Sequence, residues 1–219
     1  MLTLKNLRRE VGMGSHNFKH VITDEADLRT VLGIPSQMAA DKVIDHIDQH
    51  CAALIAKSPF LIIASADADG NMDVSPKGDP AGFVKVLDAK TLVIPDRKGN
   101  KRGDTFTNIL KNPRVALIFL TPGYQETLRV SGTAKIVRDS DLLQSFAHHG
   151  TLPLFATVVN VEKALFHCAK CIIRSGLWEH TGVEGVPSLG TVLVAHAELG
   201  QTPEEVQRSL DESLVNNLY

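Results

Sequence analysis

The chain has 219 residues and a mass of 23.8 kDa, with 43% hydrophobic and 22% charged residues. Its formal net charge of −2, from 23 Lys and Arg against 25 Asp and Glu, excludes a broadly basic nucleic-acid binder and an acidic disordered chain. No apolar run approaches the roughly 18–20 residues that a membrane helix needs. The composition predicts a soluble globular protein, and its three cysteines favour the reducing cytoplasm over a disulfide framework.

The N-terminal quarter of the chain predicts an arm followed by two helices. Residues 1–21 show no regular pattern and predict a loose arm. A capping residue at position 23 or 24 begins a helix that ends at Gly33, and Ser36 caps a longer helix that ends before Pro59. In this longer helix apolar residues recur every three or four positions and predict one buried stripe, formed by Val43, Ile44, Ile47, Cys51, Leu54 and Ile55.

Beyond Pro59 the pattern changes to short β-strands. Asp69-Gly70 is typical of a tight hairpin turn, and Gly132 inside a long alternating run predicts a bend or a close backbone approach. Several short strands at close spacing predict a barrel or a sandwich with flanking helices. The predicted strands are 60–65, 72–75, 83–87, 91–94, 115–120, 127–137 and 156–160, and the predicted helices are 105–111, 141–148 and 203–214.

The segment 94–104 carries the clearest chemical signal. It follows a strand, holds four cations and two glycines, and opens a helix. Cations beside a helix N-terminus, with glycines that let backbone N–H groups approach, form a phosphate site, and the alternative is a solvated basic loop. No Walker pattern and no G-x-G-x-x-G after a strand occur, which excludes P-loop and Rossmann sites. Between positions 97 and 114 one acid, Asp104, stands among six cations: Arg97, Lys98, Lys101, Arg102, Lys111 and Arg114.

Two further segments carry polar side chains on predicted strands. In residues 73–80, a strand ends with Ser75 and Lys77, and a turn with two prolines follows. Either the Ser75 hydroxyl and the Lys77 ammonium group bind the anionic or polar edge of a ligand, or the segment forms only a turn. In the strand 127–137, alternation places Thr127, Arg129 and Ser131 on one face. This polar row either lines a ligand groove or faces water.

Six segments, taken in this order, resemble one known family: residues 58–61, 73–80, 94–102, 108–115, 126–132 and 166–178. The family is that of the pyridoxamine 5′-phosphate oxidase-like flavoproteins, and the resemblance is to its subgroup of predicted flavin-nucleotide-binding proteins rather than to the vitamin-pathway oxidase. It implies a mainly β (α+β) fold, the FMN-binding split β-barrel with flanking helices, and a homodimer with FMN at the subunit interface. The expected organisation is an arm (1–21), a helical segment (22–57), the split-barrel domain (58–180) and a C-terminal extension with a terminal helix (181–219).

The resemblance also implies cofactor-binding residues on four segments. In the phosphate clamp, the matching residues are Lys101 and Arg102. Asn100 occupies the clamp's polar position, and Arg97 is an assisting cation. Those of the strand along the ribityl chain and flavin edge are Ser75 and Lys77. Those of the strand that reaches the cofactor, from the second subunit, are Thr127 and Arg129. A late segment near the cofactor contributes Arg174 and Trp178.

We therefore expect an FMN-dependent oxidoreductase with a small-molecule electron donor and acceptor, and with neither nucleic acid nor membrane as partner. In such proteins FMN carries the redox chemistry, and a cation near the ring favours the reduced, anionic flavin. No general acid or base stands out, and the residues that grip pyridoxal phosphate in the vitamin-pathway oxidase have no match. The alternative is a non-catalytic FMN- or haem-binding module.

Two motifs invite a metal or thiol interpretation that we do not adopt. Cys168 and Cys171 form a C-x-x-C motif, but no second pair completes a four-ligand set, so we expect these cysteines to pack in the core. His46 and His50 are spaced as two ligands on one helical face, yet no H-E-x-x-H motif accompanies them, and we expect them at the surface. No metal site is predicted.

Overall fold

The computed structural model describes residues 17–180, 182–216 and 218–219, and the chain divides into two compact units between Ala40 and Asp41. Most of the predicted arm, residues 1–16, lies outside the described residues. In the first unit, α1 (Glu25–Leu32) begins where the Asp24 carboxylate accepts a hydrogen bond from the Asp27 N–H, and it ends at Gly33, whose φ is 78°. The predicted start and end of this helix are confirmed. None of the described helices has the length and apolar character that crossing a bilayer requires.

The longer helix predicted from Ser36 to Pro59 is wrong, because the structure contains two short helices there, α2 (Gln37–Asp41) and α3 (Gln49–Lys57). Between them Ile44 pairs with Ala164 as a β-bridge, with N···O distances of 3.0 and 2.8 Å. Asp48 then caps α3 by accepting hydrogen bonds from two backbone N–H groups. A long-range backbone pairing thus replaces the helix that the local pattern favours, although α3 still buries the apolar stripe at Cys51, Leu54 and Ile55.

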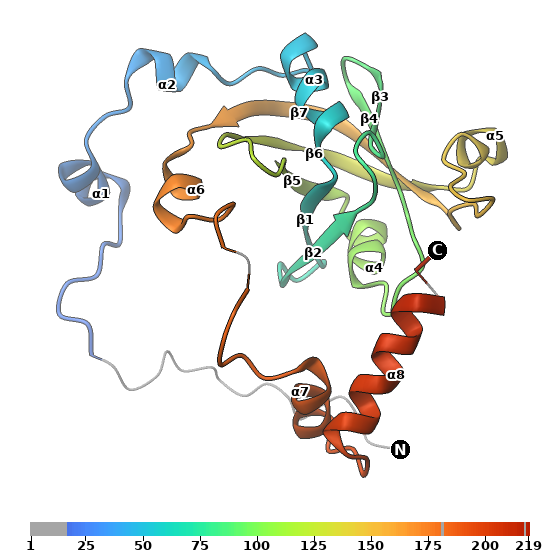
Figure 1. Cartoon of the computed structure of the whole chain (residues 1–219). Coiled ribbons are helices and arrows are strands. Elements are labelled where there is room, and N and C mark those ends of the chain that lie inside the picture. The colour runs from blue at the N-terminus through green and yellow to red at the C-terminus, as the bar shows by residue number, and fades with distance from the viewer. Residues whose placement is uncertain (1–16, 181, 217) are drawn as a thin grey trace. The chain divides into compact units, whose positions relative to one another are not determined.

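The second unit is built on one seven-stranded sheet in which every neighbouring pair is antiparallel (Figure 1). The spatial order is β2-β1-β5-β6-β7-β4-β3. This mainly β sheet with flanking helices confirms the predicted split-barrel fold class. The strands are β1 (Phe60–Ala66), β2 (Met72–Gly78), β3 (Lys85–Asp88), β4 (Thr91–Pro95), β5 (Arg114–Leu120), β6 (Thr127–Val137) and β7 (Ala156–His167).

The hydrophobic core lies between the inner face of the sheet and the helices α3 and α4 (Asp104–Lys111). Alternate residues of β1 and β5 point into it, among them Leu61 and Phe119, which are fully buried. Each such side chain contributes on the order of 1.5–3 kcal/mol on burial. Val93 points to the opposite side of β4, where it packs in a smaller cluster with Leu143 of α5 (Ser140–Gln144).

The long strand pair β6–β7 contains a register shift between Ser131 and Gly132. At Gly132 the neighbouring backbone comes so close that a Cβ atom would lie 1.9 Å from the Asn160 carbonyl oxygen. Only glycine fits such an approach, which confirms the expectation for this position.

Three helices complete the second unit: α6 (Lys170–Ser175), α7 (Leu189–His196) and α8 (Pro203–Asn216). The sequence predicted α8 but neither α6 nor α7. Helices α7 and α8 cross closely at Gly190, where a Cβ atom would lie 2.4 Å from the Pro203 carbonyl oxygen.

The two cysteines of the C-x-x-C motif are exposed and free, so the expectation that they pack in the core is wrong. Cys168 directly follows β7, and Cys171 lies in the first turn of α6. Cys51 is the buried cysteine, and burial raises the pKa of its thiol to about 12, which keeps it protonated and unreactive.

Candidate functional site

Two of the predicted segments meet around a cavity of about 810 Å³. The cavity lies beside β2, the loop between β4 and α4, the first turn of α4 and the residues before β7, and its volume is within the range of small-molecule sites, roughly 300–1,000 Å³. It is lined by residues 73–78, Phe83, residues 95–106, Leu154 and Phe155. Six residues expected to bind the cofactor lie here: Ser75, Lys77, Arg97, Asn100, Lys101 and Arg102.

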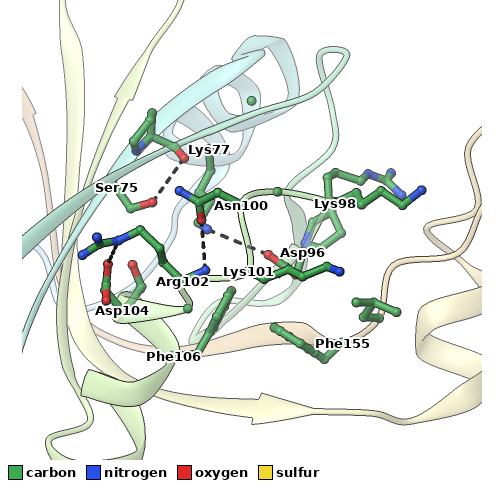
Figure 2. A pocket seen from close by; sticks show the side chains of 18 of the residues that line it. Ser75, Lys77, Asp96, Lys98, Asn100, Lys101, Arg102, Asp104, Phe106 and Phe155 are labelled. Carbon is green, nitrogen blue, oxygen red and sulfur yellow. Dashed lines mark hydrogen bonds and ion pairs between the residues drawn. The ribbon is translucent and has the colours of Figure 1, made fainter. Parts of the chain in front are cut away.

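The loop between β4 and α4 lines the cavity with Lys98, Lys101 and Arg102 (Figure 2). Lys101 has a positive φ of 62°, and Gly103 follows with 68°. The Asn100 side-chain oxygen accepts a hydrogen bond from the Arg102 N–H at 3.0 Å, which closes the turn from within. Asn100 therefore shapes the loop, and Arg102 donates from Nε to Asp104 Oδ2 at 2.7 Å.

Helix α4 presents its N-terminus to this loop. Its N-cap is Gly103, which offers no side chain to the first-turn N–H groups, so the positive end of the helix is suited to an anion. Two hydrogen bonds hold the helix against the sheet: Thr105 Oγ1 donates to Asp73 Oδ2 at 3.2 Å, and the buried Asn108 Nδ2 donates to Ser65 Oγ at 3.1 Å.

The other part of the cavity is aromatic and contains a carboxyl group (Figure 2). The rings of Phe106 and Phe155 pack edge to face with centroids 4.6 Å apart, and Lys77 Nζ lies 4.9 Å from the Phe106 centroid. Lys77 Nζ is also 3.9 Å from Asp96 Oδ1. Burial raises the pKa of the Asp96 carboxyl, and the Lys77 charge partly offsets this.

Sequence reasoning assigned no role to Asp96, Phe106 or Phe155. Asp96 lies inside the basic segment 94–104. An acidic residue among four cations indicates a candidate site residue, but attention to the cations alone left it without a role. The two phenylalanines lie far apart in sequence, on α4 and before β7, so no local pattern joins them.

Arg97 lines the cavity, but its guanidinium is engaged elsewhere. Its Nε donates to Asp79 Oδ2 at 2.6 Å, and one terminal nitrogen donates to the Phe146 carbonyl at 3.0 Å. The other terminal nitrogen, Nη1, is buried with no hydrogen-bond partner among the described residues. Because both Arg97 and Asp79 are largely buried, this pair fastens the start of the basic loop to the end of β2.

The remaining four predicted residues do not line this cavity. Arg129 is exposed on the outer side of β6, opposite Ile118 of β5, whereas the Thr127 hydroxyl is buried with no hydrogen-bond partner in the described part of the chain. Arg174 is exposed on α6, and Trp178 Nε1 donates to the Tyr124 carbonyl at 2.9 Å.

Metal-binding groups do not gather anywhere in the described residues: no three His, Cys, Asp or Glu side chains are placed to hold a metal ion. His46 does not share a helix with His50, because it precedes α3 and contacts Asp45. His50 is exposed, as expected.

Three solved structures illustrate the likeness to known proteins. HupZ from Group A Streptococcus is 21% identical, with 54% of this chain and 91% of that chain covered and a TM-score of 0.44. An FMN-binding protein from Syntrophomonas wolfei subsp. wolfei is 12% identical, with coverages of 53% and 83% and a TM-score of 0.42. The FAD binding protein from Mycobacterium smegmatis is 17% identical, with coverages of 57% and 97% and a TM-score of 0.39.

The family itself is shown by sequence. No curated protein matches the chain. Residues 47–168, more than half of the chain, match the family model described as pyridoxamine 5′-phosphate oxidase. The matched range includes β1 to β7 and the basic loop before α4. The chain belongs to the pyridoxamine 5′-phosphate oxidase family.

Proposed function

We propose that the protein binds FMN non-covalently in the cavity beside β2 and α4 and acts as an FMN-dependent oxidoreductase. The observation that carries this proposal is the arrangement of the basic loop, whose Lys101 and Arg102 line the cavity at the N-terminus of α4. Such a combination of cations and free helix N–H groups suits a phosphate group.

The chemistry of the cavity residues fits the other parts of FMN. The rings of Phe106 and Phe155 offer an apolar surface to an aromatic ring system, and Ser75 and Lys77 offer hydrogen-bond donors to its polar edge or to the ribityl chain. When bound, FMN supplies hydride or electron transfer. The residues of this chain bind and orient it, keep water from part of it, and place the Lys77 charge near it, which favours an anionic ring.

We also propose a homodimer in which the second copy completes the site. The outer side of β2, β1 and β5 is apolar and includes Phe60, Met72 and Val74, all of them exposed. Such a contiguous apolar surface favours a partner with the same surface, as in a two-fold dimer. Arg129 lies on the same outer side, on β6. In the proposed dimer it would contact the cofactor bound to the partner subunit.

The electron donor and acceptor are small molecules in this proposal, and a cytoplasmic location stays a prediction from the cysteine content. The visible spectrum of the purified protein, followed by a fluorescence titration with FMN, tests the cofactor. A flavin spectrum that is released on denaturation, or saturable quenching of FMN fluorescence, supports the proposal. A Soret band supports the haem-binding alternative, and a colourless protein that leaves FMN fluorescence unchanged overturns FMN binding.

Turnover needs its own measurement, because bound flavin does not by itself establish catalysis. Anaerobic reduction of the loaded protein by either nicotinamide, followed by reoxidation with a panel of acceptors, separates an oxidoreductase from a flavin carrier. Reduction and reoxidation faster than those of free FMN support the enzyme, and rates equal to those of free FMN leave a non-catalytic binding module.

A further inference from the structure

Asp96 is held in the cavity wall by its backbone. Its N–H donates to the Phe155 carbonyl at 3.0 Å, directly after the last residue of β4. Its side chain is 14% exposed and points toward Lys77, whose side chain is 20% exposed (Figure 2). The carboxyl group is therefore held at the cavity wall, largely shielded from solvent, and faces a single ammonium group.

The ion pair only partly compensates for burial. The distance of 3.9 Å between Lys77 Nζ and Asp96 Oδ1 exceeds the roughly 2.7–2.9 Å of a charge-assisted hydrogen bond. Burial is the larger influence on the Asp96 carboxyl and raises its pKa, and Lys77 lowers it by a smaller amount. Further dehydration of this carboxylate therefore favours its protonated form still more.

The other charged groups around the cavity are engaged elsewhere or act weakly on this carboxyl. Arg97 is paired with Asp79, and Arg102 is paired with Asp104. Of all these groups, Lys77 is the charge that affects the pKa of Asp96. The titratable and charged groups on the surrounding elements are Asp73, Lys77 and Asp79 at β2, Arg97, Lys98, Lys101 and Arg102 in the loop, Asp104 on α4, and His148 and His149 before β7.

We propose that the Asp96 carboxylate takes up one proton from solvent when a ligand fills this cavity, so that ligand binding is linked to pH through the Lys77–Asp96 pair. The inference rests on the proposed function, because the ligand is taken to be FMN. In this step the Asp96 carboxylate and one proton from solvent form a carboxylic acid, without any change of oxidation state.

Two effects of a ligand act in the same direction. A ring in the cavity displaces the water that still reaches Asp96, which disfavours its charged form. An electron-rich ligand atom near Lys77 also competes for the ammonium group and weakens its compensation of the carboxylate. Both effects raise the proton affinity of Asp96 in the filled cavity. By linkage, binding then weakens as the pH rises through the titration of Asp96, by up to about tenfold in Kd per pH unit.

Calorimetric titration of the wild-type protein with FMN, in two buffers of different ionisation enthalpy, measures the protons taken up on binding. The Asp96→Asn variant removes the titrating group and keeps its shape, and Asp69→Asn makes the same charge change at an exposed turn between β1 and β2. We expect wild type and Asp69→Asn to take up the same number of protons, and Asp96→Asn to take up fewer, by up to about one per site. Titration of the FMN phosphate contributes equally to all three and cancels in the comparison.

Lys77→Met gives a second readout in case Asp96→Asn is poorly folded. Without the ammonium group, Asp96 holds its proton to higher pH before binding, so the pH range of excess proton uptake moves upward. Equal proton uptake by wild type and Asp96→Asn, or an unmoved range in Lys77→Met, overturns this inference and leaves FMN binding intact. If wild type binds no FMN at any pH, the proposed function and this inference fail together.

Discussion

Arg97 donates from Nε to Asp79 Oδ2 at 2.6 Å and thereby joins the loop after β4 to the residue that follows β2. The Asp79 side chain is 2% exposed, and its second oxygen accepts a hydrogen bond from the Tyr219 hydroxyl at 3.0 Å. The Arg97 guanidinium also lies 5.7 Å from the centre of the Tyr219 ring. The basic loop of the candidate site is therefore anchored by a buried ion pair and not only by its own turns.

Asp79→Ala leaves the Arg97 guanidinium without its counter-charge in a largely buried place. Removing one partner of a buried pair costs about 3–5 kcal/mol, and urea unfolding at pH 7 measures the loss. Tyr219→Phe is the matched control, because it removes one hydrogen bond and costs about 1 kcal/mol. Equal unfolding free energies of wild type and Asp79→Ala would show that the ion pair does not hold the loop.

The phosphate assignment predicts a large effect of Lys101→Ala combined with Arg102→Ala. Hydrogen bonds to charged groups contribute about 1.5–3 kcal/mol each, so the double variant should bind FMN at least about 100-fold more weakly. Fluorescence quenching of FMN measures the change in Kd. Lys57→Ala combined with Lys111→Ala removes two exposed cations at other helix ends and should leave Kd unchanged. Unaltered flavin affinity in the first double variant would remove the phosphate assignment.

The proposed dimer predicts a specific effect of Met72→Glu. Met72 is 68% exposed on the apolar outer side of β2, and a carboxylate there would have to be dehydrated in the interface. Size-exclusion chromatography with light scattering should show a wild-type dimer and a monomeric variant with reduced FMN content. Leu110→Glu places the same charge at an exposed position on α4 and should stay dimeric. A monomeric wild type, or a variant as dimeric as wild type, speaks against this surface as the interface.

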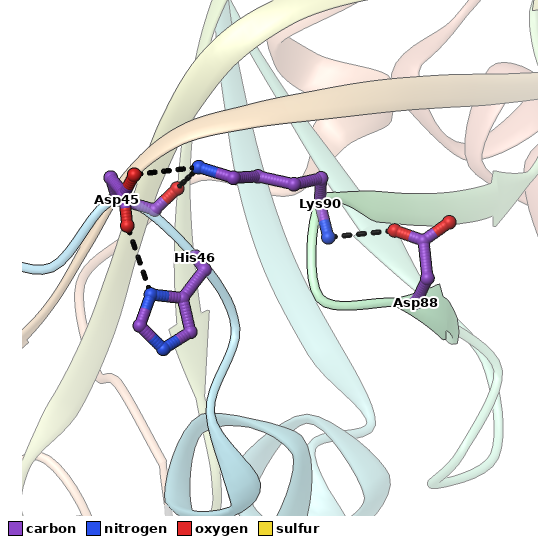
Figure 3. A network of polar contacts seen from close by, with 4 residues as sticks. All are labelled: Asp45, His46, Asp88 and Lys90. Carbon is purple, nitrogen blue, oxygen red and sulfur yellow. Dashed lines mark hydrogen bonds and ion pairs between the residues drawn. The ribbon is translucent and has the colours of Figure 1, made fainter.

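The segment that leads into α3 is tied to the β3–β4 turn by Asp45 (Figure 3). Hydrogen bonds from His46 and then from Lys90 lower the pKa of Asp45 to about 2. Because this pKa is lower in the folded than in the unfolded state, the contribution to stability is present above about pH 4 and is lost as the pH falls toward 2.

Lys90→Met should therefore reduce the acid sensitivity of the fold between about pH 4 and pH 2. Thermal unfolding at pH 7 and at pH 3 measures this, and the difference in Tm between the two pH values should be smaller in the variant. Lys57→Met, an exposed lysine at the end of α3, serves as control and should keep the wild-type difference. A Lys90→Met protein with the wild-type difference would contradict the role of this contact.

Gly132→Ala should disrupt the β6–β7 pairing. A Cβ atom 1.9 Å from the Asn160 carbonyl oxygen cannot be accommodated without moving backbone, so we expect a loss of more than about 4 kcal/mol or a failure to fold. Expression yield and urea unfolding measure it. Gly182→Ala introduces the same methyl group where no atom of the described residues outside its chain neighbours lies within 4 Å, and it should be neutral. A stable Gly132→Ala protein would mean that the two strands can separate at this point.

Local patterns in the sequence were sufficient for much of the fold and for part of the site. Alternating apolar residues specify β1 and β6, a capping aspartate and a glycine specify α1, and the glycine at position 132 indicates the close approach of two strands. The segments at 73–80 and 94–104 stood out because cations, glycines and strand ends lie close together along the chain. These features depend on residues only a few positions apart, for which backbone preferences and side-chain periodicity are decisive.

What the tertiary structure alone decided depends on residues far apart in the chain. The pairing of Ile44 with Ala164 interrupts a helix that local preference favours, because a backbone hydrogen bond to the sheet outweighs a few weak propensities. The position of Lys77 opposite Asp96 follows from the way β2 and the end of β4 border one cavity, and no spacing in the sequence contains it. The sequence thus determined which residues are cations and where most strands begin. Packing decided which cations face the cavity, which one is neutralised by Asp79, and which carboxyl group lies among them.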